Sequence, residues 1–272
     1  MTTILLGLLG PCVAFALLER SPRLWLRPLP FLRPRFWTDA FYLLTGFLAG
    51  SALTVLYILA VSAALTALGA PRLETLRLSP WVLVPLAVVG LDAGQYFAHW
   101  LMHRYDLLWE FHKAHHSSLE LDWLATFRSH LGEQTLRRVV GPLPLMLAGV
   151  PLEVIALGGA VYGAFAIFNH SNLRLGLGGL DWVLVSPRFH HLHHVPRTTE
   201  KNLGTVFTLW DVLRGTAIRA AAPADVAFGL PGDREDYPQD WPRQFLAPPA
   251  ALFARLRLAI QRPVRSAPPS LG

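Results

Sequence analysis

Residues 79–103 read SPWVLVPLAVVGLDAGQYFAHWLMH, an apolar run that ends in two histidines. A helix needs about 20 mostly apolar residues to cross the hydrocarbon core of a bilayer, and this run meets that length. Its second half carries Asp92, Tyr96, His99 and His103, which are spaced four, three and four residues apart. In an α-helix this spacing places the four side chains on one face. The stretch therefore predicts a membrane-spanning helix whose polar face bears histidines.

The composition of the whole chain also favours a membrane protein. Of its 272 residues, 53% are hydrophobic and 15% are charged, whereas soluble domains carry about 25% charged residues. Two further apolar runs, at residues 2–18 and 40–68, are long enough to span a bilayer. We predict an all-α fold, an integral membrane helical bundle with a histidine-rich helical cap on its cytoplasmic side.

A fourth apolar tract, residues 139–168, does not have the length of a simple span. As one helix it would measure about 45 Å, which is too long for one upright crossing and too short for two crossings of a core of about 30 Å. Pro142, Pro144, Gly149 and Pro151 interrupt it. We predict a bent hairpin of two short or tilted helices that turns near residues 149–151 and returns His170 to the side of the other histidines.

The basic residues predict how the chain is oriented. Of the 24 Lys and Arg residues, five lie in residues 20–35, and only Arg72 and Arg77 lie between the second and third apolar runs. By the positive-inside rule the loop with Arg72 and Arg77 is outside and the other basic regions, with the histidines, are cytoplasmic. The pI near 10 points to anionic lipid headgroups rather than to nucleic acid, because no nucleic-acid recognition motif is present. The excess of Arg over Lys suggests the inner membrane of a GC-rich bacterium.

All eleven histidines of the chain lie between His99 and His194. Imidazole is neutral near neutral pH and binds iron, zinc or copper through a ring nitrogen. One HxxxH and two HxxHH groupings in an apolar chain therefore indicate a metal site. A tetrahedral centre takes three or four protein ligands, so this set is large enough for two ions. The predicted ligands are His99, His103, His112, His115, His116, His170, His190, His193 and His194.

Helical geometry predicts how these histidines divide. Adjacent residues on a helix diverge by about 100°, so His115 and His116 can face different ions. The last grouping follows the same logic. Two histidines stay open: His191 lies outside the HxxHH register and either supports a ligand or is exposed, and His130 either supports a ligand or is structural.

Asp92 and Tyr96 are the candidate catalytic residues, expected to act through the metal ligands. Ionisable side chains within a span usually face a bundle interior or a site. Asp92 could orient a ligand imidazole or form a hydrogen bond between helices. The sequence favours neither role over the other.

The histidine groupings and their flanks resemble the fatty acid hydroxylase and sterol desaturase superfamily of membrane di-metal oxygenases. The resemblance covers roughly residues 37–231. It rests on the order and spacing of these elements: Asp92-x3-Tyr-x2-His-x3-His103-Arg, His112-x2-His-His116, Asn169-His170, Pro187-Arg-Phe-His190-x2-His-His194, Leu209-Trp-Asp211 with Gly215-Thr216, and Phe228-Gly-Leu-Pro231.

This resemblance implies an enzyme that holds two iron ions, which zinc can replace, and uses O2 to hydroxylate or desaturate a fatty acyl, sterol or isoprenoid lipid. No haem-binding or flavin motif occurs in the chain, so the resemblance also implies a separate electron-transfer protein. We expect an N-terminal span with a basic cytoplasmic loop at residues 1–36 and the histidine-bearing membrane domain at residues 37–231. Residues 232–272 would form a tail, in which residues 245–262 read as an interfacial amphipathic helix or a helix packed on the cytoplasmic part.

Two other functions compete with an oxygenase. A histidine-rich membrane hydrolase would use zinc and no O2. A metal transporter would place its ligands near mid-membrane, whereas these histidines are predicted at the cytoplasmic mouth. A non-enzymatic lipid-binding scaffold leaves the histidines unexplained.

Overall fold

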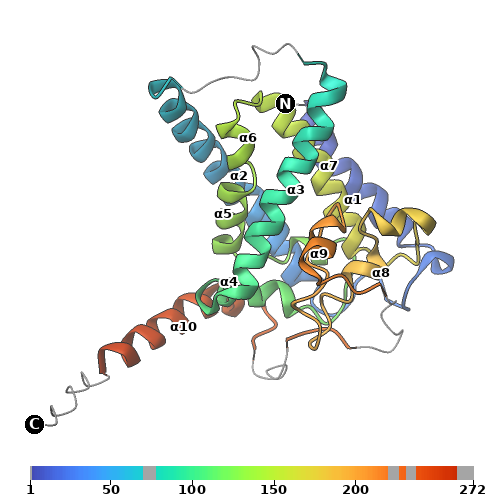
Figure 1. The fold of residues 1–272 in the computed structure, drawn as a ribbon. Coiled ribbons are helices and arrows are strands. Elements are labelled where there is room, and N and C mark those ends of the chain that lie inside the picture. The colour runs from blue at the N-terminus through green and yellow to red at the C-terminus, as the bar shows by residue number, and fades with distance from the viewer. Residues whose placement is uncertain (1, 70–77, 220–226, 231–236, 262–272) are drawn as a thin grey trace, which may run out of the picture.

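The structure, a computed structural model, describes residues 2–69, 78–219, 227–230 and 237–261, and its regular elements there are all helices (Figure 1). In this part of the chain there is no β-sheet, only isolated bridges between Trp25 and Leu173 and between Leu184 and Phe207. The helices are α1 (Thr2–Leu18), η1 (Pro22–Leu24), α2 (Phe36–Ala67), α3 (Pro80–Arg104), α4 (Asp106–His116), η3 (Ala125–Phe127), α5 (Leu131–Val140), α6 (Leu143–Leu147), α7 (Leu152–His170), η4 (Gly178–Trp182), α8 (Pro187–His190), α9 (Leu209–Arg214) and α10 (Trp241–Gln261).

Three of these helices, α2, α3 and α7, are long and apolar enough to cross a membrane. The predicted all-α membrane bundle is therefore confirmed. The apolar helix α1 packs along α7, with the rings of Phe15 and Phe168 5.9 Å apart. The loop that carries Arg72 and Arg77 lies outside the described residues.

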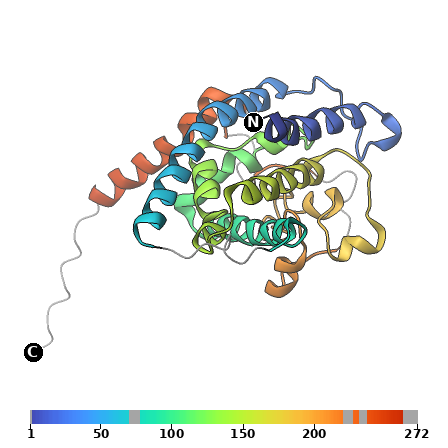
Figure 2. The same ribbon diagram turned by 90° about the horizontal axis from the view of Figure 1, so that it is seen from above.

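Helix α3 is the centre of the bundle, because α4, α5, α6 and α7 all pack against it (Figures 1 and 2). Ala87, Leu91 and Leu145 form a buried apolar cluster between α3 and the hairpin. Gly94 lets the end of α5 approach closely, since a Cβ there would lie 2.4 Å from the carbonyl oxygen of Gly141. With α5 packed this closely, the polar face of α3 that bears Asp92, Tyr96 and His99 lies in the interior of the bundle.

The apolar tract at 139–168 does form a hairpin, with its turn at the predicted place. Gly149 adopts a left-handed conformation with φ of 73°, and the amide of Val150 donates to the carbonyl of Leu145. The arm before the turn begins earlier than predicted, at Leu131. His130 caps α5 by accepting from the amide of Gly132 at 3.0 Å, so the polar residues before 139 extend the arm.

The ends of α3 and α7 that carry histidines lie beside α4 and α8, at the opposite end of the bundle from α6 (Figure 1). The predicted C-terminal helix is present as α10 and starts earlier, at Trp241. Its first turns pack against α2 and α4, and its later part extends away from the bundle (Figure 1). Gln244 is fully buried and donates to the hydroxyl of Ser117 at 2.9 Å, which fixes α10 to the end of α4.

A buried ionic network joins the N-terminal segment to this end. Arg33 donates to Asp122 at 2.6 and 2.7 Å and also pairs with Asp39 at the start of α2. Asp39 in turn accepts from Arg128, and both side chains are fully buried. Buried charges need such pairing because desolvation is costly. The network therefore fixes the loop before α5 against α2.

Candidate metal centre

The structure brings the nine histidines that spacing predicts as ligands into two adjoining groups. The ligand nitrogens within each group all lie within 4.8 Å of one another. The five-histidine group comprises His99, His103, His112, His116 and His193. The four-histidine group comprises His115, His170, His190 and His194.

The two groups interleave along the chain as helical geometry predicts. His115 and His116 are adjacent on α4 and enter different groups, with their ring planes 88° apart. His193 and His194 divide in the same way, with planes 76° apart. The hairpin α5–α7 delivers His170 to the four-histidine group, so residues from four helices (α3, α4, α7 and α8) and from the segment after α8 meet at one end of the bundle.

Backbone carbonyls set the tautomers of the facing imidazoles in the five-histidine group. Nδ1 of His99 lies 2.9 Å from the carbonyl oxygen of Leu203, and Nδ1 of His193 lies 3.0 Å from that of Lys201. A carbonyl oxygen only accepts, so each neutral ring carries its proton on Nδ1. The two Nε2 atoms are then unprotonated, yet they lie 3.0 Å apart. Two lone pairs at that distance repel unless a cation lies between them.

The four-histidine group repeats this arrangement. Nδ1 of His115 donates to the carbonyl of Arg128 at 3.0 Å, and Nδ1 of His170 donates to the carbonyl of Ala166 at 2.8 Å and to Oδ1 of Asn169 at 2.7 Å. Their Nε2 atoms face each other at 3.2 Å. Each group thus presents converging acceptor nitrogens without protons.

The spacing of these nitrogens fits ligands of a common metal. Two imidazole nitrogens about 2.0–2.1 Å from one ion, with about 90–110° between the bonds, lie about 2.9–3.4 Å apart. The facing Nε2 pairs lie 3.0 to 3.3 Å apart. In addition, both ring nitrogens of His116 and of His194 are buried without a hydrogen-bond partner among the described residues. No donor from this part of the chain therefore occupies the nitrogen through which each ring would bind a metal.

Burial also keeps these rings neutral. Desolvation holds the pKa of each candidate ligand histidine outside the membrane-spanning helices well below its usual value, and neighbouring imidazoles add to the effect in several of them. These residues are His112, His115, His116, His190, His193 and His194. Neutral imidazole is the form that binds a metal.

Several of the groups that orient the ligands were not predicted from the sequence. The carbonyls of Arg128, Lys201 and Leu203 carry no side-chain signal, because any residue type can supply a carbonyl. Glu133 was also missed. Its carboxylate lies 3.0 Å from Nδ1 of His112 and accepts from Arg137 at 3.0 Å, although it stands apart from every histidine grouping in the sequence.

Asp92 is placed away from the imidazoles and holds the segment after the last histidine grouping. Its two oxygens accept from the amides of Val206 and Phe207, each at 3.0 Å, and from the indole of Trp210 at 2.7 Å. Asp92 therefore does not contact an imidazole. Instead it joins α3 to the loop before α9 and to Trp210 of α9, which is close to the alternative role, a hydrogen bond between helices.

Tyr96 acts one step further from the ligands. Its hydroxyl donates to Asp211 at 3.2 Å, and Asp211 also accepts from the amides of Leu203 and Gly204 and from the hydroxyl of Thr216. Leu203 supplies the carbonyl that orients His99. Tyr96 and Asp211 thus position the His99 ring through the backbone.

The two histidines left open by the sequence lie outside both groups. His191 is buried, and its Nε2 lies 3.2 Å from the carbonyl of His170 while its ring packs on Phe228. His130 caps α5 and donates from Nε2 to the carbonyl of Phe245 at 2.9 Å, so its role is structural.

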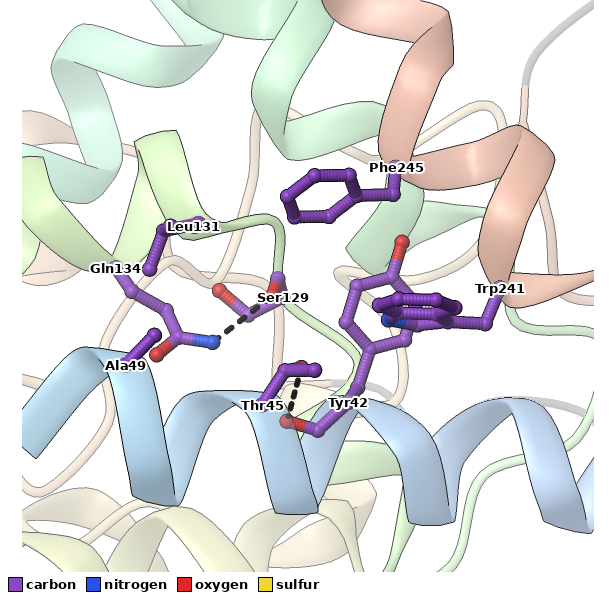
Figure 3. A pocket seen from close by; sticks show the side chains of 8 residues that line it. All are labelled: Tyr42, Thr45, Ala49, Ser129, Leu131, Gln134, Trp241 and Phe245. Atoms are coloured by element: carbon purple, nitrogen blue, oxygen red, sulfur yellow. Dashed lines mark hydrogen bonds between the residues drawn. The ribbon is translucent and has the colours of Figure 1, made fainter.

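A pocket of about 200 Å³ lies where α2, the start of α5 and the start of α10 meet (Figure 3). Tyr42, Trp241 and Phe245 contribute aromatic rings to it. On its other side lies Ser129, which follows the Arg128 that orients His115. The pocket therefore adjoins both the exposed face of a candidate span and the support of the four-histidine group.

Comparison with known protein families identifies this arrangement. Residues 84–216 match the family model described as fatty acid hydroxylase. The chain carries a fatty acid hydroxylase domain. That domain contains all nine grouped histidines together with Asp92, Tyr96 and Asp211, whereas α2 and α10 lie outside the matched residues.

Curated relatives of the fatty acid hydroxylase domain are named as lipid oxygenases. Ornithine lipid hydroxylase OlsE of Rhizobium tropici is 34% identical over 151 residues, which are 55% of this chain and 46% of the relative. Alkylglycerol monooxygenase of Danio rerio is 30% identical over 134 residues, 48% of this chain and 29% of the relative. The human alkylglycerol monooxygenase is 30% identical over 155 residues, 56% of this chain and 34% of the relative. The matches thus cover less than half of each relative's length, and no solved structure matches the chain.

Proposed function

We propose that this protein is a membrane di-iron oxygenase that uses O2 to hydroxylate a lipid. The observation that carries the proposal is the pair of histidine groups whose Nε2 lone pairs converge at 3.0 to 3.3 Å. Five ligands would hold one ion and four would hold the other. The oxygenase names of the curated relatives support the same reaction class.

Iron is favoured over zinc by the chemistry of the reaction. When bound, two iron ions supply the redox change that O2 activation and C–H oxidation require, which zinc does not provide. Imidazole ligands suit iron and zinc equally, so zinc can occupy the groups in overexpressed protein. The need for a redox-active metal distinguishes an oxygenase from a histidine-rich zinc hydrolase.

The residues of the chain have distinct tasks in this proposal. The imidazoles hold the ions through nitrogens whose orientation is fixed by Leu203, Lys201 and Arg128 carbonyls. Glu133 contributes a buried carboxylate beside His112, which partly offsets the charge of an all-imidazole centre. The buried positions of the rings exclude water from the ions, which limits side reactions.

The substrate class we propose is a membrane lipid with a hydrocarbon chain. Hydroxylation is favoured over desaturation because the named relatives are a hydroxylase and monooxygenases. The pocket beside α2 and α10 is our candidate for holding part of that chain, since aromatic rings border it and it adjoins a candidate span. Replacing Ala49, which lines it, with Phe should raise KM for the lipid while leaving the metal content unchanged.

The reaction also needs a reductant and a location. We propose a separate one-electron donor protein as the source of electrons. We place the protein in a bacterial inner membrane with both histidine groups at the cytoplasmic face, as the positive-inside rule predicts.

The deciding experiment combines metal analysis with isotope labelling. Purified protein should contain about two metal ions per chain, and iron should be the metal that supports activity. A host that expresses the chain under ¹⁸O2 should accumulate a lipid that carries one labelled oxygen. A single ion in active protein would contradict the dinuclear site, and activity with zinc in the absence of O2 would favour the hydrolase.

A further inference from the structure

An exposed apolar surface lies beside the outer side of α3. The short segments that form it are not among the helices long enough to span a membrane. It is formed by η4 with the residue after it and by α9, and we call it the η4–α9 surface. Leu213 is 70% exposed and Trp182 is 65% exposed. Its members are Leu180, Trp182, Val183, Leu209, Val212 and Leu213, all of them large and exposed.

These residues form one surface because their segments are bonded together. The amide of Thr208 donates to the carbonyl of Val183 at 2.9 Å, and its hydroxyl donates to the carbonyl of Trp182 at 2.8 Å. In both ribbon views α9 stands beside α3 on the outside of the bundle (Figures 1 and 2). Soluble surfaces rarely expose a contiguous apolar patch of this kind without a partner.

The position of this surface along α3 indicates what covers it. Asp92, which holds Trp210 and the backbone before α9, is the middle residue of α3. The guanidinium of Arg214, at the end of α9, lies 4.9 Å from the ring of Trp100. Counted from Pro80, about 20 residues of α3 cross the hydrocarbon core, so α9 lies between mid-membrane and the headgroups.

Charge at the edge of the surface fits a lipid headgroup layer. Arg188, Arg214 and Arg219 are exposed beside it, and the guanidinium of Arg219 stacks over Trp182 at 3.4 Å from the ring centroid. Trp and Arg together are typical of the bilayer interface, where the ring is half in hydrocarbon and the cation pairs with phosphate. If a second protein covered this surface, the surface would not need to lie at the same depth as the membrane-crossing part of α3. A bilayer leaflet requires that depth.

We propose that the η4–α9 surface is inserted in the bilayer leaflet next to the histidine groups, with its arginines bound to anionic lipid headgroups. The segment from η4 to α9 includes α8 with His190, and His193 and His194 after it. Its insertion therefore sets the depth of both groups relative to the lipid. This inference depends on the described surface and does not require the proposed reaction.

The test measures depth at single labelled positions. In a Cys12→Ser background, Leu213→Cys or Trp182→Cys carries an environment-sensitive fluorophore, and the protein is reconstituted in vesicles of equal parts phosphatidylcholine and phosphatidylglycerol. Glu200→Cys, exposed in the loop after the last histidine grouping, is the matched control. We expect blue-shifted emission and strong quenching by doxyl-labelled lipid at 213 and 182 and neither at 200.

Two further measurements keep the outcomes distinct. Changing Arg188, Arg214 and Arg219 together to Gln should weaken the quenching at 213, as should vesicles of phosphatidylcholine alone. Emission at 213 and 182 equal to that at 200, in protein that is folded and inserted, would overturn the proposal. Crosslinking between two copies through position 213, without quenching by lipid, would overturn it in favour of a dimer contact.

Discussion

The Nε2 atoms of His99 and His193 lie 3.0 Å apart, although 94 residues separate them in the sequence. Each ring already donates from Nδ1 to a carbonyl, so neither can bridge the gap with a proton while neutral. The fold thus brings together two groups that repel without a cation. Metal binding should consequently stabilise the folded protein.

Removing one ligand should weaken metal binding in its group. We expect His193→Ala to lower the metal content below the proposed two ions per chain and to abolish activity, because the five-histidine group loses a central nitrogen and the remaining imidazoles no longer surround the ion as before. His191→Ala is the neighbouring control: it lies outside both groups and should keep its metals and much of its activity. It should lose only about 1–3 kcal/mol of stability, since it contacts the His170 carbonyl. Equal metal loss in both variants would contradict the assignment.

Asp211 should act on metal affinity without touching a ligand. In Asp211→Asn the amides of Leu203 and Gly204 lose a carboxylate acceptor, and the Leu203 carbonyl is no longer held towards His99. Disturbing such supporting groups typically weakens metal binding by about 10–100-fold. Titration with a competing chelator measures this. Asp181→Asn, in η4, should bind metal like the wild type, and an unchanged affinity in Asp211→Asn would remove its positioning role.

The buried ionic network should be a stability element. Asp39→Asn leaves Arg33 and Arg128 buried with a carboxylate removed from between them. Breaking a buried pair in this way costs about 3–5 kcal/mol, and we expect a clear fall in Tm. Asp240→Asn removes a half-exposed partner of Arg243 and should change Tm little. Similar Tm values for the two variants would show that the network does not stabilise the fold.

The metal-free protein should lose stability as the pH falls. Burial holds the pKa of His112, His116 and His193 well below the usual value, so the unfolded chain binds more protons than the folded chain below about pH 6.5. The stability contributed by the neutral rings is complete above that pH and is lost on acidification. We expect Tm of the chelator-treated protein to drop between about pH 7 and pH 5. A flat profile would contradict neutral rings in the fold.

The orientation can be tested by cysteine labelling in the Cys12→Ser background. Asp106 and Glu200 are exposed at the histidine end, and Ser79 is exposed at the start of α3. Labels at 106 and 200 should react from the cytoplasmic side and a label at 79 from the other side. Ser118 and Ser171 are buried and unsuited to labelling. Opposite accessibility of 106 and 200 would mean that the histidine groupings cannot form one centre.

Much of the site could be predicted because helical periodicity converts sequence spacing into direction. The spacing of His112, His115 and His116 specifies which rings share a face, and the interrupted tract before His170 specifies a return to the same side. The partners of Asp92 could not be predicted in this way, since they lie 114 to 118 residues away and two of them are backbone amides. Contacts between distant backbone and a single carboxylate leave no pattern in the sequence.

His115 and His116 share a peptide bond and yet belong to different groups, as do His193 and His194. Any shift of α4 that improves one group must move a ligand of the other by a similar amount. The two groups are therefore joined mechanically at two points, and binding of the first ion arranges nitrogens for the second. Loading should be cooperative, so partly loaded protein would consist mainly of empty and full chains with few that hold a single ion.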